Sequence, residues 1–109
     1  MNWNQLTTEE ELAFILAKSY VQPQVIFKHS TRCSISQVIK TRLEKAESIP
    51  NVDYHYLDLI TYRSLSDKIS KDLDVYHESP QVLLIQNGKC VFYESHMAIR
   101  MADIVAEVV

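Results

Sequence analysis

The sequence predicts a single α/β domain in which a mixed four-stranded sheet carries helices on both faces. The chain has 109 residues, of which 47% are hydrophobic, enough for one core rather than two. Apolar runs of strand length alternate along it with segments of helical period. The Asn87-Gly88 pair then separates the last two runs, and Asn-Gly is the strongest short signal for an antiparallel hairpin.

The first helix is expected from about residue 8 to residue 20. Thr7 and Thr8 are each followed three residues later by a glutamate, which offers two overlapping capping boxes. Pro23 ends the segment, and the apolar run within residues 24–29 is expected to be a strand buried on both faces of the sheet. The positions of the helix expected to face the core are Leu12, Ile15, Leu16 and Tyr20.

The second helix is expected over about residues 33–47, and Pro50 follows it closely. A second strand is expected over residues 52–59, with alternate residues on opposite faces. One face would carry Val52, Tyr54 and Tyr56, and the other His55, Leu57 and Leu59. The inward stripe of the second helix would consist of Ile35, Val38, Ile39, Leu43 and Ala46.

A third helix is expected after Ser64, which with Asp67 can cap its start, and the apolar runs at 82–85 and 89–93 form the hairpin. Ser95 can cap a last helix. The resulting order, α-β-α-β-α-β-β-α, contains the parts of the thioredoxin fold in sequence. Inward positions are Leu65, Ile69 and Leu73 in the third helix, and Met97, Met101, Ile104, Val105 and Val108 in the last.

Composition excludes several classes of function. Eleven Lys and Arg against fourteen Asp and Glu give a formal net charge of −3, so we expect neither a nucleic-acid nor a membrane partner. Gly88 is the only glycine, which excludes a glycine-rich phosphate loop. The sequence has no apolar run of about 20 residues and no secretory signal pattern at its start. We therefore expect a cytoplasmic protein.

The chain has two cysteines, Cys33 and Cys90, which a reducing compartment would keep as thiols. Cys33 falls where a strand gives way to a helix, and the unpaired N–H groups and positive dipole end of a helix start favour the thiolate. Arg32 beside it, with Lys28 or His29 near, would add to that effect. The alternative is an unreactive Cys33. Cys90, among apolar neighbours, is expected to pack.

Two segments carry a family resemblance, residues 29–36 (His-Ser-Thr-Arg-Cys-Ser-Ile-Ser) and residues 77–81 (His-Glu-Ser-Pro-Gln). They resemble the two signatures of the YtxJ-type monothiol bacilliredoxins, a branch of the thioredoxin-like superfamily, and the similarity spans essentially the whole chain in element order. The resemblance implies that Cys33 is the reactive thiol and that Pro80 is a cis-proline facing it. Many relatives have proline at the position of Ser34.

One sulfur limits the reaction that is expected. Ser36 occupies the place of the second cysteine of a dithiol enzyme and cannot resolve a mixed disulfide. We therefore expect an enzyme, a monothiol oxidoreductase, in which Cys33 removes a low-molecular-weight thiol from protein mixed disulfides. The resemblance implies bacillithiol as that thiol and as co-substrate, with S-thiolated proteins as partners and no resident cofactor.

The candidate substrate-binding residues flank Cys33 and Pro80. Backbone groups beside a cis-Pro80 could pair with an incoming chain in β fashion. Arg32 or Lys28 could pair with the malate carboxylates of bacillithiol. No metal site is expected, because the four histidines are scattered, and His55 and His96 are expected to be structural or solvated. The candidates are Thr31, Arg32, Ser79 and Pro80 for binding, and Ser36, His29 and His77 for tuning the thiol.

Two other functions remain open. A monothiol iron–sulfur carrier would hold a cluster with Cys33 from two chains and two external thiols. Relatives that do this have Gly-Phe where this chain has Ser34-Ile35. A non-catalytic stress-response module would instead bind a partner in the groove beside Pro80.

Overall fold

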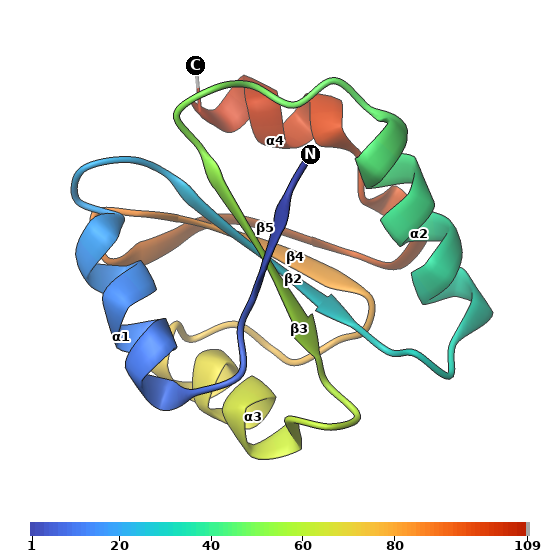
Figure 1. Cartoon of the computed structure of the whole chain (residues 1–109), viewed down its shortest axis with the longest axis horizontal. Helices are drawn as coiled ribbons and strands as arrows, with labels where there is room; N and C mark the ends of the chain where they lie inside the picture. The colour runs from blue at the N-terminus through green and yellow to red at the C-terminus, as the bar shows by residue number, and fades with distance from the viewer. Residues whose placement is uncertain (109) are drawn as a thin grey trace.

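The computed structural model describes residues 1–108 and contains a five-stranded sheet in the order β1-β3-β2-β4-β5 (Figure 1). Strands β1, β3 and β2 run parallel to one another, whereas β4 is antiparallel to β2 and β5 is antiparallel to β4. The sheet is therefore mixed, as predicted. The strands are β1 (Trp3–Gln5), β2 (Gln24–His29), β3 (Asp53–Asp58), β4 (Gln81–Gln86) and β5 (Lys89–Ser95).

Helices cover both faces of the sheet. Figure 1 shows α1 and α3 together on one side, and α2 and α4 on the other. This arrangement confirms the predicted element order, apart from one added strand. The helices are α1 (Glu9–Lys18), α2 (Ser34–Lys45), α3 (Arg63–Asp72) and α4 (Met101–Val108), with a short 3-10 helix η1 (His96–Ala98) before α4.

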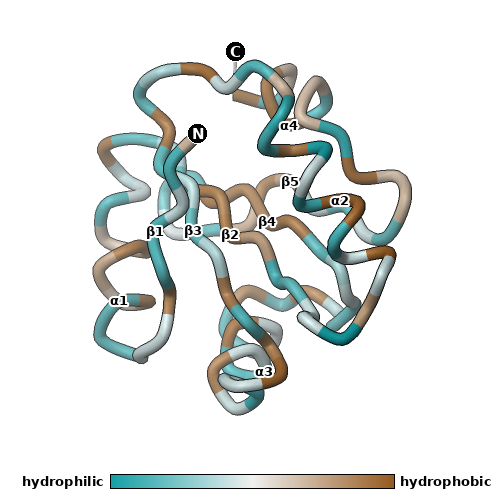
Figure 2. Tube along the Cα trace, turned by 45° about the vertical axis from the view of Figure 1, so that its right-hand side comes forward, coloured by the Kyte–Doolittle hydropathy of each residue, from teal (hydrophilic) through white to brown (hydrophobic). Residues whose placement is uncertain are grey.

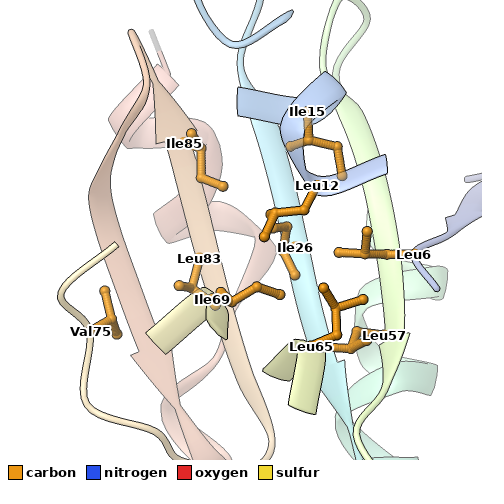
Figure 3. Packing of buried hydrophobic residues seen from close by; sticks show 10 residues of the cluster. All are labelled: Leu6, Leu12, Ile15, Ile26, Leu57, Leu65, Ile69, Val75, Leu83 and Ile85. Carbon is orange, nitrogen blue, oxygen red and sulfur yellow. The ribbon is translucent and has the colours of Figure 1, made fainter. Parts of the chain in front are cut away.

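Two apolar clusters fill the space between sheet and helices. All six residues of β2 are buried, as expected for a central strand, and Figure 2 shows hydrophobic residues concentrated along the central strands. The cluster under α2 and α4 contains Val25, Phe27, Ile39, Leu43, Tyr54, Val82, Leu84, Ile99, Met101 and Ile104. The cluster under α1 and α3 contains Leu6, Leu12, Ile15, Ile26, Leu57, Leu65, Ile69, Val75, Leu83 and Ile85 (Figure 3).

The fifth strand, β1, corrects the prediction of four. Its three residues show no alternating apolar pattern, so nothing in the sequence marked them as a strand. Tertiary contacts hold them instead: the Trp3 ring stacks on Phe27 with centroids 5.6 Å apart, and the Leu6 N–H donates to the Tyr56 carbonyl over 2.9 Å. β1 extends the sheet at an edge and leaves the other strands as predicted.

Two predicted helix caps are wrong. α3 begins at Arg63, with Tyr62 rather than Ser64 at its N-cap and no side-chain cap. Asp58 organises that turn, because its carboxylate accepts from the Ile60 N–H and the Thr61 hydroxyl. Ser95 precedes η1 without a side-chain cap, and α4 starts only at Met101.

The N-terminal cap and the hairpin follow the predictions. Thr8 and Glu11 form the capping box of α1. Asn87 and Gly88 both have positive φ, at 55° and 76°, as a two-residue hairpin turn requires. Tyr20 is not in the core but 67% exposed, and its ring lies against Gly88. Within residues 1–108, no helix is both long enough and apolar enough to cross a membrane.

Candidate active site

Cys33 occupies the N-cap position of α2, at the carboxyl end of β2. Its own N–H donates to the Ser30 carbonyl over 3.1 Å, and its carbonyl accepts from the Gln37 N–H over 3.2 Å. The first bond closes a tight turn, and the second begins the helix. The thiol is free and partly exposed, and the first turn of α2 has no acidic residue. The sulfur therefore lies at a helix start where backbone N–H groups lack intrahelical partners.

Ser36 closes the loop around Cys33 from inside. It is fully buried, and its hydroxyl accepts a hydrogen bond from the Ser30 N–H over 3.2 Å. The residue in the place of a second redox cysteine is thus engaged with the backbone of the turn. A hydroxyl in this position forms no disulfide with Cys33.

The Ser79–Pro80 peptide bond is cis. Lys28 and Gln81 are register partners on the antiparallel strands β2 and β4, so the end of β2 and the start of β4 lie at the same edge of the sheet (Figure 1). Pro80 immediately precedes β4, and Cys33 follows β2 by four residues. The topology therefore brings the two predicted halves of the site to one edge.

The backbone beside Pro80 is only partly engaged. The Pro80 carbonyl accepts from the His96 N–H over 2.8 Å. Within residues 1–108, the backbone N–H and carbonyl of Ser79 have no hydrogen-bond partner, and its buried hydroxyl oxygen has none either. Ser79 therefore offers free backbone groups at this edge.

A family model matches the part of the chain that contains Cys33, Ser36 and Pro80. The model for the monothiol bacilliredoxin BrxC matches residues 4–104. The chain belongs to the monothiol bacilliredoxin family. Membership and fold together give it a role in thiol redox chemistry.

Solved structures share the fold of this bacilliredoxin. One of them is a protein assigned as an oxidoreductase with a thioredoxin fold. It has a TM-score of 0.82 and 27% identity, covering 94% of this chain and 89% of that one. Thioredoxin from Fasciola hepatica has a TM-score of 0.75 and 20% identity, covering 96% and 95%. Thioredoxin from Malassezia sympodialis has a TM-score of 0.76 and 13% identity, covering 98% and 88%.

His29 is the last residue of β2 and is buried against aromatic rings. Its ring centroid lies 5.3 Å from that of Tyr56 and 5.7 Å from that of Phe27, and its Nδ1 has no hydrogen-bond partner within residues 1–108. Burial lowers the pKa of His29, as does Lys40 on α2, against the opposing effect of Asp58. The imidazole is therefore held neutral behind the first turn of α2.

His77 lies on the other face of the sheet, against α3. Its Nδ1 is 3.4 Å from both the Nζ of Lys28 and the hydroxyl oxygen of Ser66. Burial lowers the pKa of His77, and the positive charges of Lys28 and Arg63 lower it further. The two histidines flanking the site in sequence therefore occupy different environments, one among aromatic rings and one in a polar cluster.

The charged and polar residues predicted to bind substrate divide into two groups. Thr31 and Arg32 are exposed beside Cys33. Lys28 is fully buried and bound to α3, so the expectation that it pairs with a ligand carboxylate is wrong. Its side chain points to the α3 face because β2 alternates sides, and it shares that face with Ile26. Arg32 is the cation adjacent to the thiol.

Two apolar residues predicted for the core of α2 are instead exposed near Cys33. Ile35 and Val38 are 44% and 51% exposed, and Ser36 takes the inward position of the first turn together with Ile39 and Leu43. Met97, predicted for the core of the last helix, is 51% exposed, and its carbonyl accepts from Arg42 of α2 over 2.9 Å. The prediction that these apolar side chains lie in the core is wrong, because helical spacing alone does not fix which of two neighbouring positions faces inward.

Cys90 lies at the far end of the β4–β5 hairpin. It is the register partner of Ile85, four residues from Gln81 and so about 13 Å along the strand from the edge that carries Pro80. Its sulfur lies 3.3 Å from the Phe92 carbonyl oxygen, and burial raises the pKa of its thiol. Disulfide formation needs two Cα atoms within about 7 Å, so Cys90 is placed to pack and not to resolve Cys33.

The other two histidines lie away from any metal-type cluster. His55 Nε2 is 2.8 Å from Gln24 Oε1 inside the structure, and His96 is more than half exposed. Over the described residues 1–108, no three His, Cys, Asp or Glu side chains are arranged to hold a metal ion.

Proposed function

We propose that this bacilliredoxin removes a low-molecular-weight thiol from mixed disulfides on protein cysteines, with Cys33 as the nucleophile. The observation that carries the proposal is a single, partly exposed thiol at the start of α2, with a buried serine in the place of the second sulfur. The family supports bacillithiol as the small thiol.

The reaction consists of two exchanges in which sulfur–sulfur bonds are conserved. The Cys33 thiolate attacks the sulfur of the small thiol in the mixed disulfide, and the substrate protein leaves as a thiolate that takes up a proton. Cys33 then carries the small thiol. A second molecule of low-molecular-weight thiol attacks that disulfide, which releases the symmetrical small disulfide and regenerates the Cys33 thiolate.

The first product persists until an external thiol arrives. Ser36 has no sulfur, and Cys90 lies at the other end of the hairpin. Neither can resolve the intermediate within the chain. The protein is therefore suited to removing small thiols rather than to reducing disulfides between protein cysteines.

Substrate docking is supported by the groups at the edge of the sheet. The unpaired N–H and carbonyl of Ser79 can pair with an extended segment of the substrate protein. Ile35 and Val38, two and five residues after Cys33 on α2, are exposed and offer apolar contact. Arg32 is the cation available to a carboxylate of the small thiol, since Lys28 is buried.

Intact mass spectrometry tests this proposal with two matched variants. A protein carrying bacillithiol on one cysteine is incubated with the wild type, Cys33→Ser or Cys90→Ser, without free thiol. The wild type and Cys90→Ser should gain the mass of one small thiol and release the substrate, and Cys33→Ser should do neither. The same substrate carrying glutathione tests which small thiol is preferred.

Release of the substrate by Cys33→Ser would overturn the assignment of the nucleophile. An unmodified wild type, with the substrate still thiolated, would favour the binding-module alternative. Cluster absorbance in anaerobically purified protein, lost in Cys33→Ser, would favour the iron–sulfur carrier.

A further inference from the structure

Lys28 is the one lysine, arginine, aspartate or glutamate among residues 1–108 that is fully buried. It lies on the α3 face of β2, the face that also carries the core residue Ile26. Figure 3 shows Ile26 within that cluster. A charged side chain in such a place must satisfy its donors within the protein. The partners of Lys28 therefore show what the protein uses it for.

The Nζ of Lys28 contacts three groups from two other parts of the chain. It donates to the Ser66 carbonyl over 3.0 Å and to the Ser70 hydroxyl over 2.8 Å, both on α3. Its third contact is the Nδ1 of His77, at 3.4 Å, in the segment between α3 and Pro80. One side chain thus joins the strand that leads to Cys33, helix α3, and the segment that carries the cis-proline.

We propose that Lys28 is a positioning residue for the active site, and that it acts through His77 on the segment ending at Pro80. His77 precedes Pro80 by three residues, and Lys28 pairs in register with Gln81 directly after it. The segment from His77 to Gln81 is therefore held at both of its ends. Strand pairing holds it at Gln81, and the Lys28 ammonium holds it at His77. Ser79, whose free backbone groups would receive a substrate, lies between these points.

The charge on Lys28 sets the protonation of His77. An ammonium has no acceptor, so His77 receives its contact on an unprotonated Nδ1 and carries its ring proton on Nε2. The charged groups around the pair are Asp67 on α3, Arg63 at the start of α3, and Glu78 beside His77. Burial lowers the pKa of Lys28 to about 8, against the effect of Asp67, so this contact is sensitive to pH near that value.

Substitution of Lys28 should leave the fold intact. In Lys28→Met, the Ser70 hydroxyl still donates to the Ser66 carbonyl, at 3.3 Å, and the Ser66 hydroxyl still lies within reach of His77 Nδ1. No buried acceptor is left alone, and methionine fills the space of the aliphatic stem. Replacing a buried charge by an apolar residue of similar size is often neutral for stability.

The kinetic test compares Lys28→Met with Lys71→Met, which makes the same change at an exposed position of α3. With a bacillithiol-carrying protein as substrate, Lys28→Met should raise KM about fivefold, the equivalent of one hydrogen bond, and leave kcat and the alkylation rate of Cys33 by iodoacetamide unchanged. His77→Ala should raise KM similarly, and the double variant no more than either single one. A KM of Lys28→Met equal to that of Lys71→Met, or additive effects in the double variant, would overturn the proposal.

The kinetic test rests on the proposed function. Two further measurements of the Lys28 role do not depend on it. The ring nitrogen resonances of His77 should show a step near pH 8 in the wild type and none in Lys28→Met. Amide hydrogen exchange at His96, whose N–H donates to the Pro80 carbonyl, should be faster in Lys28→Met than in Lys71→Met. If the wild type releases no small thiol, the proposed function fails while these measurements still decide whether Lys28 holds the segment. Unchanged exchange would overturn the positioning role.

Discussion

The backbone N–H of Ser30 donates a hydrogen bond of 3.2 Å to the hydroxyl of Ser36, and this bond ties the start of the Cys33 loop to the first turn of α2. Ser36 is fully buried and Ser30 nearly so. The serine therefore satisfies a backbone donor that water does not reach. Ser36 therefore has two effects in this chain. It leaves Cys33 without a second sulfur nearby, and it stabilises the loop that carries Cys33.

Ser36→Ala should lower the free energy of unfolding by about 1–2 kcal/mol, because it leaves the buried Ser30 N–H without an acceptor. Urea unfolding followed by fluorescence measures the change. Ser34→Ala, at the exposed first position of the same helix, should change stability by less than about 0.5 kcal/mol. Equal effects of the two variants would mean that the Ser36 bond does not hold the loop.

Gly88→Ala should destabilise the hairpin by about 1–2 kcal/mol, since its φ of 76° is unfavourable for a residue with a Cβ. That Cβ would also lie 2.5 Å from the Tyr20 hydroxyl oxygen. The ring of Tyr20 has to move aside to admit that Cβ, so Gly88→Ala should cost less in a Tyr20→Ala background. The two backgrounds are compared by thermal unfolding, and an identical cost in both would show that the backbone conformation alone is responsible.

The predictable parts of the fold are those that leave a local pattern in the sequence, such as an apolar run in a buried strand or a characteristic pair of turn residues. β2 is buried throughout because both of its faces are covered, and its apolar run at residues 25–27 reflects this. The Asn87-Gly88 turn follows from two positive φ values. β1 was not predictable, because stacking of Trp3 on Phe27 holds it rather than a local pattern. The start of α3 was misplaced because Asp58 organises a turn in which no side chain caps the helix.

The candidate site shows the same division. Cys33 and Pro80 could be located from their motifs, and the sheet register then places them at one edge. Lys28 could not be recognised as buried, because lysine is almost always exposed and its partners on α3 are about forty residues away in sequence. Ile35 was assigned to the core because its spacing fits a helix stripe, yet the Ser30 bond draws Ser36 inward instead.

Lys28→Met should change how stability depends on alkaline pH. The pKa of Lys28 is lowered from 10.5 to about 8 in the folded state by burial, so between these values the unfolded state binds more protons and the wild type gains stability as pH rises. The gain amounts to at most about 3 kcal/mol. Lys28→Met should therefore be most stable relative to the wild type near pH 7, with the advantage shrinking toward pH 10.

Urea unfolding of both proteins at a series of pH values measures this difference. Tyr54, Tyr56 and Cys90 have pKa values raised by burial and reduce stability at alkaline pH, but they are common to both proteins and cancel in the comparison. A stability difference that stays constant from about pH 7 to pH 10 would show that the folded protein does not disfavour the charge on Lys28.

His29→Phe should protect the fold against acid. Burial lowers the pKa of His29 below its ordinary 6.5, so the folded protein loses stability as pH falls through 6.5, where the unfolded chain takes up a proton that the folded state resists. Phenylalanine keeps the contacts with Phe27 and Tyr56, cannot be protonated, and removes the Nδ1 that has no partner. The variant should match the wild type near pH 8 and become increasingly more stable than it as pH falls below 6.5, as measured by urea unfolding. Parallel pH dependence of the two proteins would instead assign the acid sensitivity to His55 and His77, whose pKa values burial also lowers.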